Sequence, residues 1–282
     1  AMCISASADS INATSPTESA SNPRSASRSA IASATQRNWA ALLTLGKQMA
    51  RTPGSTAASR SAAASLSGAL IRTTTWAPLA GAGLLVATGA DEELTEWAIE
   101  NKPLWGDDPD SVSDRLLATS SALYYLTALM APSASAGDKV KGLAVGVGSR
   151  LTAAGLAEVL KSSTGRERPN GYSDNSLPSG HAAMASANAV LVSRNVEYID
   201  MPGWAASSMK AGMWTIAGVA SWARVEAGSH YVSDVLVGLA LGNFVTTFLQ
   251  DAFLGPAPRQ MNLGFTAVEQ GGVLTLSIPF DP

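Results

Sequence analysis

Residues 178–187 read PSGHAAMASA, a turn followed by an alanine-rich run that strongly favours a helix. Proline and glycine interrupt regular structure before His181, and the small residues after it can continue as a helix without interruption. The sequence therefore predicts a turn that ends at Gly180 and a helix that begins near His181.

Apolar runs on both sides of this stretch repeat the helical signal. The strongest runs are 76–90, 116–131, 211–223 and 235–249. The 282-residue chain is 46% hydrophobic and only 15% charged, and its many alanine, serine and glycine residues allow helices to pack closely. These features predict an all-α fold, a helical bundle of about six core helices.

Polar segments divide the chain into four predicted parts. Residues 1–35 are poor in large apolar side chains and predict a flexible leader, because they cannot bury enough surface to offset the entropy of ordering. Residues 36–72 predict an N-terminal helical segment that includes an amphipathic helix over 39–49. The helical domain that carries the site is expected over 73–255. Residues 256–282 are expected to form an appendage with a short C-terminal β-hairpin.

The chain contains only two histidines, and each lies in a distinctive local setting. His181 follows Ser179 and Gly180 at the predicted start of a helix, where the first backbone N–H groups lack intrahelical partners. Such a helix end binds phosphate readily, and Gly180 lets the backbone approach an anion closely. A capped helix with an exposed histidine is the alternative interpretation of this tetrapeptide.

The second histidine, His230, precedes Asp234 by four residues near the start of a predicted helix over 231–250. If both side chains share a helix face, Asp234 accepts the N–H of one imidazole nitrogen and leaves the other nitrogen with a free lone pair. A nucleophilic imidazole needs that arrangement. A surface ion pair or a core histidine would give the same spacing.

Three cationic side chains stand near these histidines in the sequence. Lys161 ends an apolar helical stretch that Gly165 is expected to terminate, Arg168 lies in the loop after it, and Arg224 precedes His230 by six residues. Fixed cations stabilise the charge of a phosphoryl group in the transition state, and the arginine fork binds two oxygens at once. Taken singly, each of these cations is more typical of a solvated surface.

Taken together, the residues resemble the three-part signature of the type-2 phosphatidic acid phosphatase superfamily. The parts are Lys161 with Arg168-Pro169, then PSGH at 178–181, then Arg224 with His230 and Asp234, in the family's order and with its spacings. The chain departs from the family at Ala223, where serine is usual, and at Val232, where many members have proline. The signature spans roughly a quarter of the chain.

The resemblance implies a helical bundle like those of acid phosphatases and vanadium haloperoxidases, with the site among the core helices. It implies that His230 is the nucleophile that forms a phosphohistidine and that Asp234 orients it. It also implies that His181 is first the general acid and then the base that activates water. The residues that it assigns to binding of the phosphoryl oxygens are Lys161, Arg168, Ser179, Gly180 and Arg224.

The predicted function is metal-independent hydrolysis of a phosphate monoester or diphosphate, with a membrane lipid or polyprenyl carrier as the expected substrate. No cofactor is implied, and two histidines and one cysteine without clustered carboxylates offer no good divalent-metal site. The alternatives are a broad-specificity exported acid phosphatase, a vanadate-dependent haloperoxidase and a non-catalytic anion-binding protein. A serine hydrolase that uses Ser179 would lack the Gly-x-Ser-x-Gly elbow and would leave the three cations without a role.

Charge and hydropathy constrain the partners. The 19 lysines and arginines are scattered and outnumbered by 22 acidic residues, which argues against a nucleic-acid partner. Cys3 is the only cysteine and cannot form an intramolecular disulfide. The apolar runs are shorter than the roughly 18 to 20 residues of a confident membrane span, so they favour buried helices and leave a membrane surface open as a partner. The resemblance points to the periplasm or the periplasmic face of a bacterial membrane.

Overall fold

The computed structural model describes residues 57–256, 262–268 and 271–277. Within these residues the chain forms eight helices and one pair of strands. The helices are α2 (Ala57–Ile71), α3 (Thr73–Thr88), α4 (Ala90–Asn101), α5 (Pro109–Met130), α6 (Ala136–Thr164), α7 (Gly180–Asn195), α8 (Gly203–Glu226) and α9 (Val232–Leu254). The strands are β1 (Asn262–Val268) and β2 (Gly271–Ser277).

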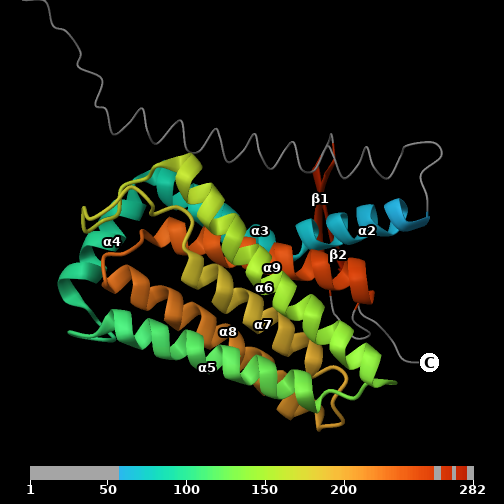
Figure 1. Cartoon of the computed structure of the whole chain (residues 1–282). Coiled ribbons are helices and arrows are strands. Elements are labelled where there is room, and N and C mark those ends of the chain that lie inside the picture. Colours follow the sequence, from blue (N-terminus) through green and yellow to red (C-terminus); the bar gives the residue numbers. More distant parts are fainter. Residues whose placement is uncertain (1–56, 257–261, 269–270, 278–282) are drawn as a thin grey trace, which may run out of the picture.

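Helices α7 and α9 form the centre of the bundle (Figure 1). Helix α7 packs against α5, α6, α8 and α9, and α9 also packs against α2 and α3. Most residues of α7 are buried, so its small side chains serve close packing on several sides. The predicted helix start is confirmed, because α7 begins at Gly180 with Ser179 as its N-cap.

Two glycines allow α9 to lie very close to α7. A Cβ atom on Gly238 would overlap the carbonyl oxygen of Ser179, and one on Gly242 would overlap the carbonyl oxygen of Ala183. Larger side chains at these two positions would push the helices apart. The contact therefore holds the start of α7 beside the start of α9, and both ends carry residues of the sequence-predicted site.

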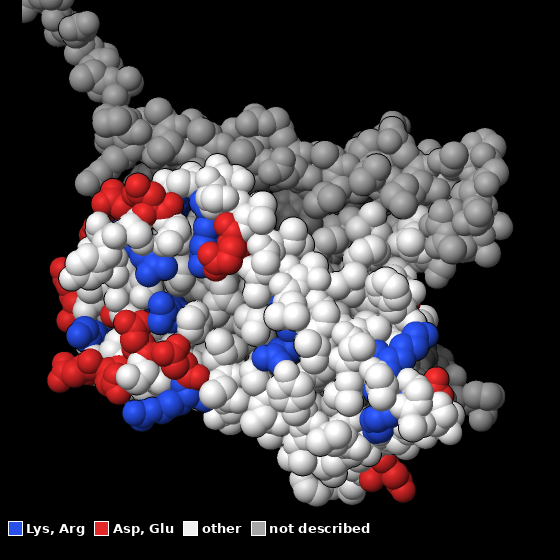
Figure 2. Space-filling view, in the orientation of Figure 1, with Lys and Arg blue, Asp and Glu red and all other residues white. Residues whose placement is uncertain are grey.

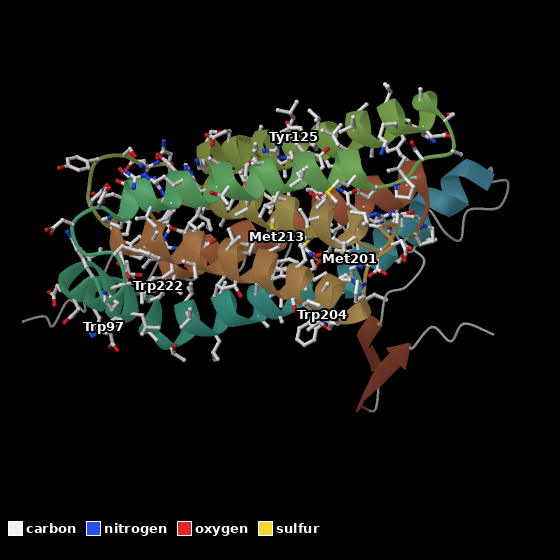
Figure 3. All side chains as sticks on the ribbon, turned by 90° about the horizontal axis from the view of Figure 1, so that it is seen from below. Trp97, Tyr125, Met201, Trp204, Met213 and Trp222 are labelled. Atoms are coloured by element: carbon white, nitrogen blue, oxygen red, sulfur yellow. The ribbon has the colours of Figure 1, made fainter. Side chains whose placement is uncertain are left out.

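The hydrophobic core lies around α7 and α8, whereas several large apolar side chains lie on the surface. Figure 3 shows Met213 of α8 inside the bundle, where it packs with Tyr124 and Leu191, and Trp204 of the same helix at the outside. The exposed large apolar side chains of α5 and α6 are Tyr125, Leu126, Leu129, Met130, Val140, Leu151, Leu156 and Val159. Both helices thus present apolar surface away from the core.

Two described helices, α6 and α9, are long and apolar enough to cross a membrane. Helix α9 is mostly buried in the bundle, which accounts for its composition, but α6 is mostly exposed along its apolar part. The run 235–249, judged too short for a span in the sequence, belongs to the 23-residue helix α9, whereas the 29-residue helix α6 contains none of the four apolar runs named in the sequence.

The prediction of a helical bundle is confirmed, but the expected number of about six core helices is wrong. Residues 73–255 contain seven helices, α3 to α9. Helix α4 contains no apolar run, because its sequence, ADEELTEWAIEN, is largely polar and acidic. Its burial depends on tertiary contacts with α3, α8 and α9, which periodicity does not reveal.

Other predictions fall at the ends of the chain. The leader over 1–35 and the helix over 39–49 lie outside the described residues. Strands β1 and β2 pair antiparallel, with Asn262 opposite Ser277 and Val268 opposite Gly271. The boundaries of the four parts stay predictions.

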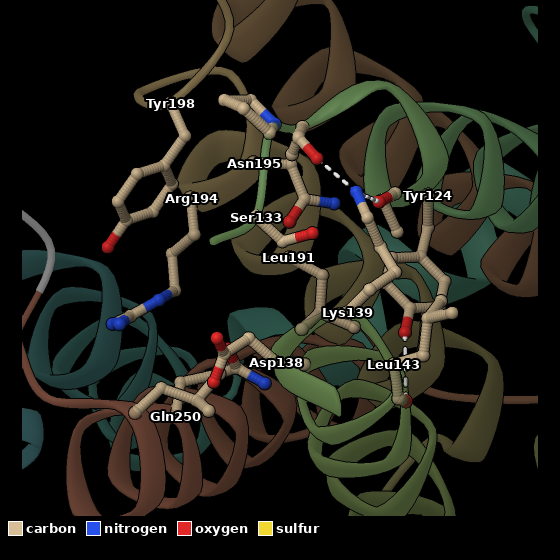
Figure 4. A pocket seen from close by; sticks show the side chains of 15 residues that line it. Tyr124, Ser133, Asp138, Lys139, Leu143, Leu191, Arg194, Asn195, Tyr198 and Gln250 are labelled. Atoms are coloured by element: carbon tan, nitrogen blue, oxygen red, sulfur yellow. Dashed lines mark hydrogen bonds between the residues drawn. The ribbon is translucent and has the colours of Figure 1, made fainter. Parts of the chain in front are cut away.

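A cavity of about 220 Å³ lies at the end of the bundle where α5 and α7 terminate (Figure 4). Its lining includes Tyr124, Lys139, Leu191, Arg194 and Gln250. None of the sequence-predicted site residues lines it. Those residues gather at the opposite end, where α6 and α8 terminate and where α7 and α9 begin.

Candidate active site

Loops at one end of the bundle bring the predicted residues together. Lys161 lies in the last turn of α6, which ends at Gly165 in a left-handed conformation as predicted. Arg224 lies in the last turn of α8, and His230 follows it in the loop before α9. Figure 2 shows charged side chains of both signs gathered at the end of the bundle where α4 lies, whereas the middle of the same face is mostly uncharged. The polar end of the molecule is the end that carries the site.

The imidazole of His230 is buried and held by one hydrogen bond. Its Nδ1 lies 2.7 Å from the backbone carbonyl oxygen of Ser176. A carbonyl oxygen only accepts, so Nδ1 carries the proton and the neutral ring keeps its lone pair on Nε2. The backbone of the loop between α6 and α7 therefore selects the tautomer that a nucleophile requires.

Burial also keeps this imidazole uncharged. Loss of solvation lowers the pKa of His230 from 6.5 to about 3, although the Ser176 carbonyl raises it. The positive charges of Arg224, Arg168 and Lys161 contribute to this lowering. All three cations therefore lie close enough to act on one imidazole.

The predicted contact between His230 and Asp234 is wrong. Asp234 Oδ2 accepts hydrogen bonds from Ser176 Oγ at 2.5 Å and from the Tyr231 N–H at 2.9 Å, and Asp234 Oδ1 accepts from Arg166 Nη1 at 2.6 Å. The prediction assumed that both residues lie on one helix, but α9 begins only at Val232. Asp234 instead occupies the third position of α9, where it forms a capping box with the N-cap Tyr231.

His181 lies in the first turn of α7 and is partly exposed. Its Nε2 is 2.8 Å from Oδ1 of Asp114, which projects from α5. Burial lowers the pKa of His181, the hydrogen bond that its imidazole donates to Asp114 raises it, and the charges of Arg224 and Lys161 oppose protonation. Both histidines thus share Arg224 and Lys161 as electrostatic neighbours.

The first turn of α7 lies against Lys161. The Ser179 side chain is buried and accepts a hydrogen bond from the Ala182 N–H at 3.4 Å, so the hydroxyl predicted to bind phosphate caps the helix in this structure. A Cβ atom on Gly180 would lie 3.6 Å from Lys161 Nζ. The lysine ammonium and the free N–H groups at the start of α7 are therefore adjacent, an arrangement suited to an anion.

Two guanidinium groups have spare donors at this site. The Nε atoms of Arg168 and Arg224 are buried and have no hydrogen-bond partner among the described residues. Buried donors of this kind normally find a partner, and a charged donor is costly to leave unpaired. Phosphoryl oxygens are acceptors that fit such donors.

Sequence reasoning did not identify three acidic side chains that pair with the predicted site residues. The pairs are Asp114 with His181 at 2.8 Å, Asp110 with Arg224 at 2.5 Å, and Glu158 with Lys161 at 2.7 Å. All three carboxylates are exposed. Asp110 and Asp114 are four residues apart on α5, which is the one local signal that places them on a common face.

Sequence reasoning also missed three residues that lie close to the nucleophile: the buried Asp91 and Ser176, and the partly buried Arg166. Arg166 lies between Lys161 and Arg168 in the sequence, but the expected motif gives it no role. Asp91 belongs to α4, and its sequence position carries no signal for this site. Among the described residues, no group of three or more histidine, cysteine, aspartate or glutamate side chains is placed to hold a metal ion.

Comparison with known proteins gives one family and two relatives. Residues 142–253 match the family model described as the PAP2 superfamily, and this segment contains every sequence-predicted site residue. A lipid A 1-phosphatase of Porphyromonas gingivalis is 37% identical over 91 residues, which are 32% of this chain and 19% of the relative. The chain thus matches about a fifth of the length of that curated relative.

A solved structure is also similar. It is described as the first transmembrane PAP2 type phosphatidylglycerolphosphate phosphatase from Bacillus subtilis. The match has 23% sequence identity and a TM-score of 0.47, and it covers 63% of this chain and 92% of the other.

Proposed function

We propose that this chain, whose residues 142–253 belong to the PAP2 superfamily, hydrolyses a phosphate monoester or diphosphate of a membrane lipid through a phosphohistidine at His230. One observation carries this proposal: a buried, neutral imidazole with a free Nε2 lone pair lies within the field of Lys161, Arg168 and Arg224. An uncharged nucleophile surrounded by cations suits attack on a dianionic phosphoryl group.

In the first step, Nε2 of His230 attacks phosphorus. The P–N bond forms while the bond from phosphorus to the leaving oxygen breaks, and protonated His181 donates its proton to that oxygen. In the second step, His181 removes a proton from water, the water oxygen bonds to phosphorus, and the P–N bond breaks. Inorganic phosphate leaves, and both imidazoles return to their starting states.

The cations supply the charge stabilisation for both steps. Lys161, Arg168 and Arg224 bind the phosphoryl oxygens together with the N–H groups at the start of α7. The exposed carboxylates of Asp110 and Glu158 pair with two of these cations in the absence of substrate, and they can turn into solvent when phosphate binds. The three cations thus face two negative charges in either arrangement, from the two carboxylates or from a dianionic phosphoryl group.

Two observations support a lipid as the phosphoryl donor. The relative from P. gingivalis is named a lipid A 1-phosphatase. In addition, exposed apolar side chains of α6 lead toward the site, since Leu156 lies five residues before Lys161, about 8 Å along the helix. An acyl or prenyl chain held against these exposed side chains would keep its phosphate at the end of the bundle that carries the site. On this proposal the enzyme acts at a bacterial membrane surface, on its periplasmic face.

The proposal is tested by measuring phosphate release in the presence of EDTA. The panel is phosphatidic acid, phosphatidylglycerophosphate, undecaprenyl diphosphate, lipid A and a soluble sugar phosphate. We expect turnover to be insensitive to EDTA, because the protein's own side chains stabilise the phosphoryl charge, and to be faster on lipids than on the sugar phosphate. Equal rates across the panel would favour a broad-specificity acid phosphatase, and activity that EDTA abolishes and Mg²⁺ restores would refute the mechanism.

The pH dependence of this reaction depends on Asp114. His181 must be protonated to act as the acid, so the rate falls as pH rises through its pKa. Because the hydrogen bond to Asp114 raises the pKa of His181, Asp114→Asn is expected to move this falling limb to lower pH.

The matched control is Asp108→Asn, an exposed acid near the start of α5 that pairs with Arg115 instead. The comparison is made on plots of kcat/KM against pH for the two variants and the wild type. A falling limb that stays in place or moves to higher pH in Asp114→Asn would contradict the role given to His181.

A further inference from the structure

The orientation of the nucleophile depends on a single backbone carbonyl in the loop between α6 and α7. Ser176 is fully buried and makes three hydrogen bonds. Its N–H donates to the Arg166 carbonyl at 2.9 Å, its Oγ donates to Asp234 Oδ2 at 2.5 Å, and its carbonyl accepts from His230 Nδ1 at 2.7 Å. A change that displaces Ser176 would therefore displace the His230 imidazole or allow its proton to move from Nδ1 to Nε2.

The side chain of Arg166 holds Asp234, the partner of Ser176 Oγ, in place. Its Nη1 donates to Asp234 Oδ1 at 2.6 Å and to Ser233 Oγ at 2.8 Å, while Nη2 donates to Asp91 Oδ2 at 2.8 Å. The guanidinium also lies 3.9 Å from the centre of the Tyr231 ring. One planar cation thus bridges two buried carboxylates, which a point charge such as an ammonium cannot do with the same geometry.

Asp91 connects helix α4 to Arg166 and to the start of α9. It lies on α4, outside the segment that matches the PAP2 family model. Asp91 Oδ1 accepts from the Ser233 N–H at 2.7 Å, and Oδ2 accepts from Ser233 Oγ at 2.6 Å. Helix α4 thereby anchors both Arg166 and the first turn of α9, on either side of the nucleophile.

We infer that Arg166, clamped between Asp91 and Asp234, is a positioning residue that holds the Ser176 carbonyl against His230 Nδ1. The inference rests on the proposed function, since it concerns the nucleophile of that reaction. Arg166 does not bind the phosphoryl group itself, because both of its terminal nitrogens are taken by carboxylates. Its contribution is to keep the lone pair of His230 Nε2 directed at phosphorus.

The test is Arg166→Lys, assayed on the best substrate of the panel. We expect kcat to fall by about 100-fold, the loss typical of a displacement of about 1 Å in a reacting group. KM and the inhibition constant for vanadate should stay within about threefold, because Lys161, Arg168 and Arg224 are unchanged. Rapid-quench measurement should locate the loss in formation of the phosphoenzyme. A generally loosened fold would weaken vanadate binding as well.

The matched control is Arg150→Lys, at a buried arginine whose guanidinium donates hydrogen bonds, within the described part of the chain, to the hydroxyl groups of Ser121 and Tyr125 on α5. It should keep kcat within about threefold. If wild type and this control turn over normally and Arg166→Lys retains more than half of the wild-type kcat, the positioning role is refuted while the proposed function stands. No turnover by the wild type on any ester would instead refute the proposed function.

A second variant covers the case in which Arg166→Lys does not fold. Ser176→Ala removes only the hydrogen bond from Oγ to Asp234 and leaves the backbone carbonyl in place. We expect it to lower kcat about 10-fold with vanadate inhibition unchanged. A folded Ser176→Ala variant with the kcat of the wild type would overturn the inference.

Discussion

His230→Ala is expected to lower the rate of phosphate release by at least about 1,000-fold, as removal of an essential nucleophile does in other enzymes. The Ala side chain offers no atom to form the covalent intermediate, and direct attack by water lacks the preorganised Nε2. The cations and His181 remain, so phosphate binding should persist. The measurement is phosphate release from a chromogenic ester, with vanadate inhibition as the readout of binding.

The control is His230→Asn, which separates the shape of the side chain from its chemistry. An asparagine amide can still donate a hydrogen bond to the Ser176 carbonyl, but it has no nucleophilic nitrogen. We expect the asparagine variant to fold like the wild type and to be as inactive as the alanine variant. Retention of more than a tenth of the wild-type rate in either variant would show that His230 is not the nucleophile.

Gly242→Ala is expected to destabilise the fold by about 3 kcal/mol or more, which is at the upper end for overpacking in a core. The added methyl group would overlap the backbone of Ala183, so α7 and α9 would have to separate. Separation also parts the start of α7 from the start of α9, and the variant should lose phosphatase activity along with stability. Thermal unfolding followed by circular dichroism measures the change.

The matched control for this prediction is Gly155→Ala on α6. A Cβ atom at Gly155 would meet nothing within 4 Å, and removing a glycine from a helix interior should stabilise the fold by up to about 1 kcal/mol. The two substitutions are chemically identical and are expected to have opposite signs. Equal unfolding temperatures for the two variants would contradict the close packing of α7 on α9.

Local signals in the sequence were enough to predict the elements on which the site is built. The turn at Pro178 and Gly180 before an alanine-rich run predicted the start of α7, and Gly165 after Lys161 predicted the end of α6. These signals act over a few residues, through backbone conformation and capping, so they do not depend on contacts with distant segments. The motif as a whole predicted that Lys161, Arg168 and Arg224 lie around His230.

Other features of the site depended on contacts between distant segments. The spacing of His230 and Asp234 indicated a direct hydrogen bond, but the helix begins between them, and a backbone carbonyl takes the place of the carboxylate. Asp91 sits on a polar helix with no apolar stripe, so neither its burial nor its contact with Arg166 could be read from its neighbours. Charge pairs that cross from one helix to another are fixed by tertiary packing alone.

The covalent intermediate is the central claim, and it can be observed directly. His181→Ala, which retains the nucleophile but lacks the base for the second step, is mixed with a ³²P-labelled ester that has a good leaving group and is then quenched in alkali, in which phosphohistidine is stable. Peptide mapping is expected to find the label on His230, with little label in the His230→Asn variant. Phosphate release without labelled His230, or label on another residue, would contradict the account.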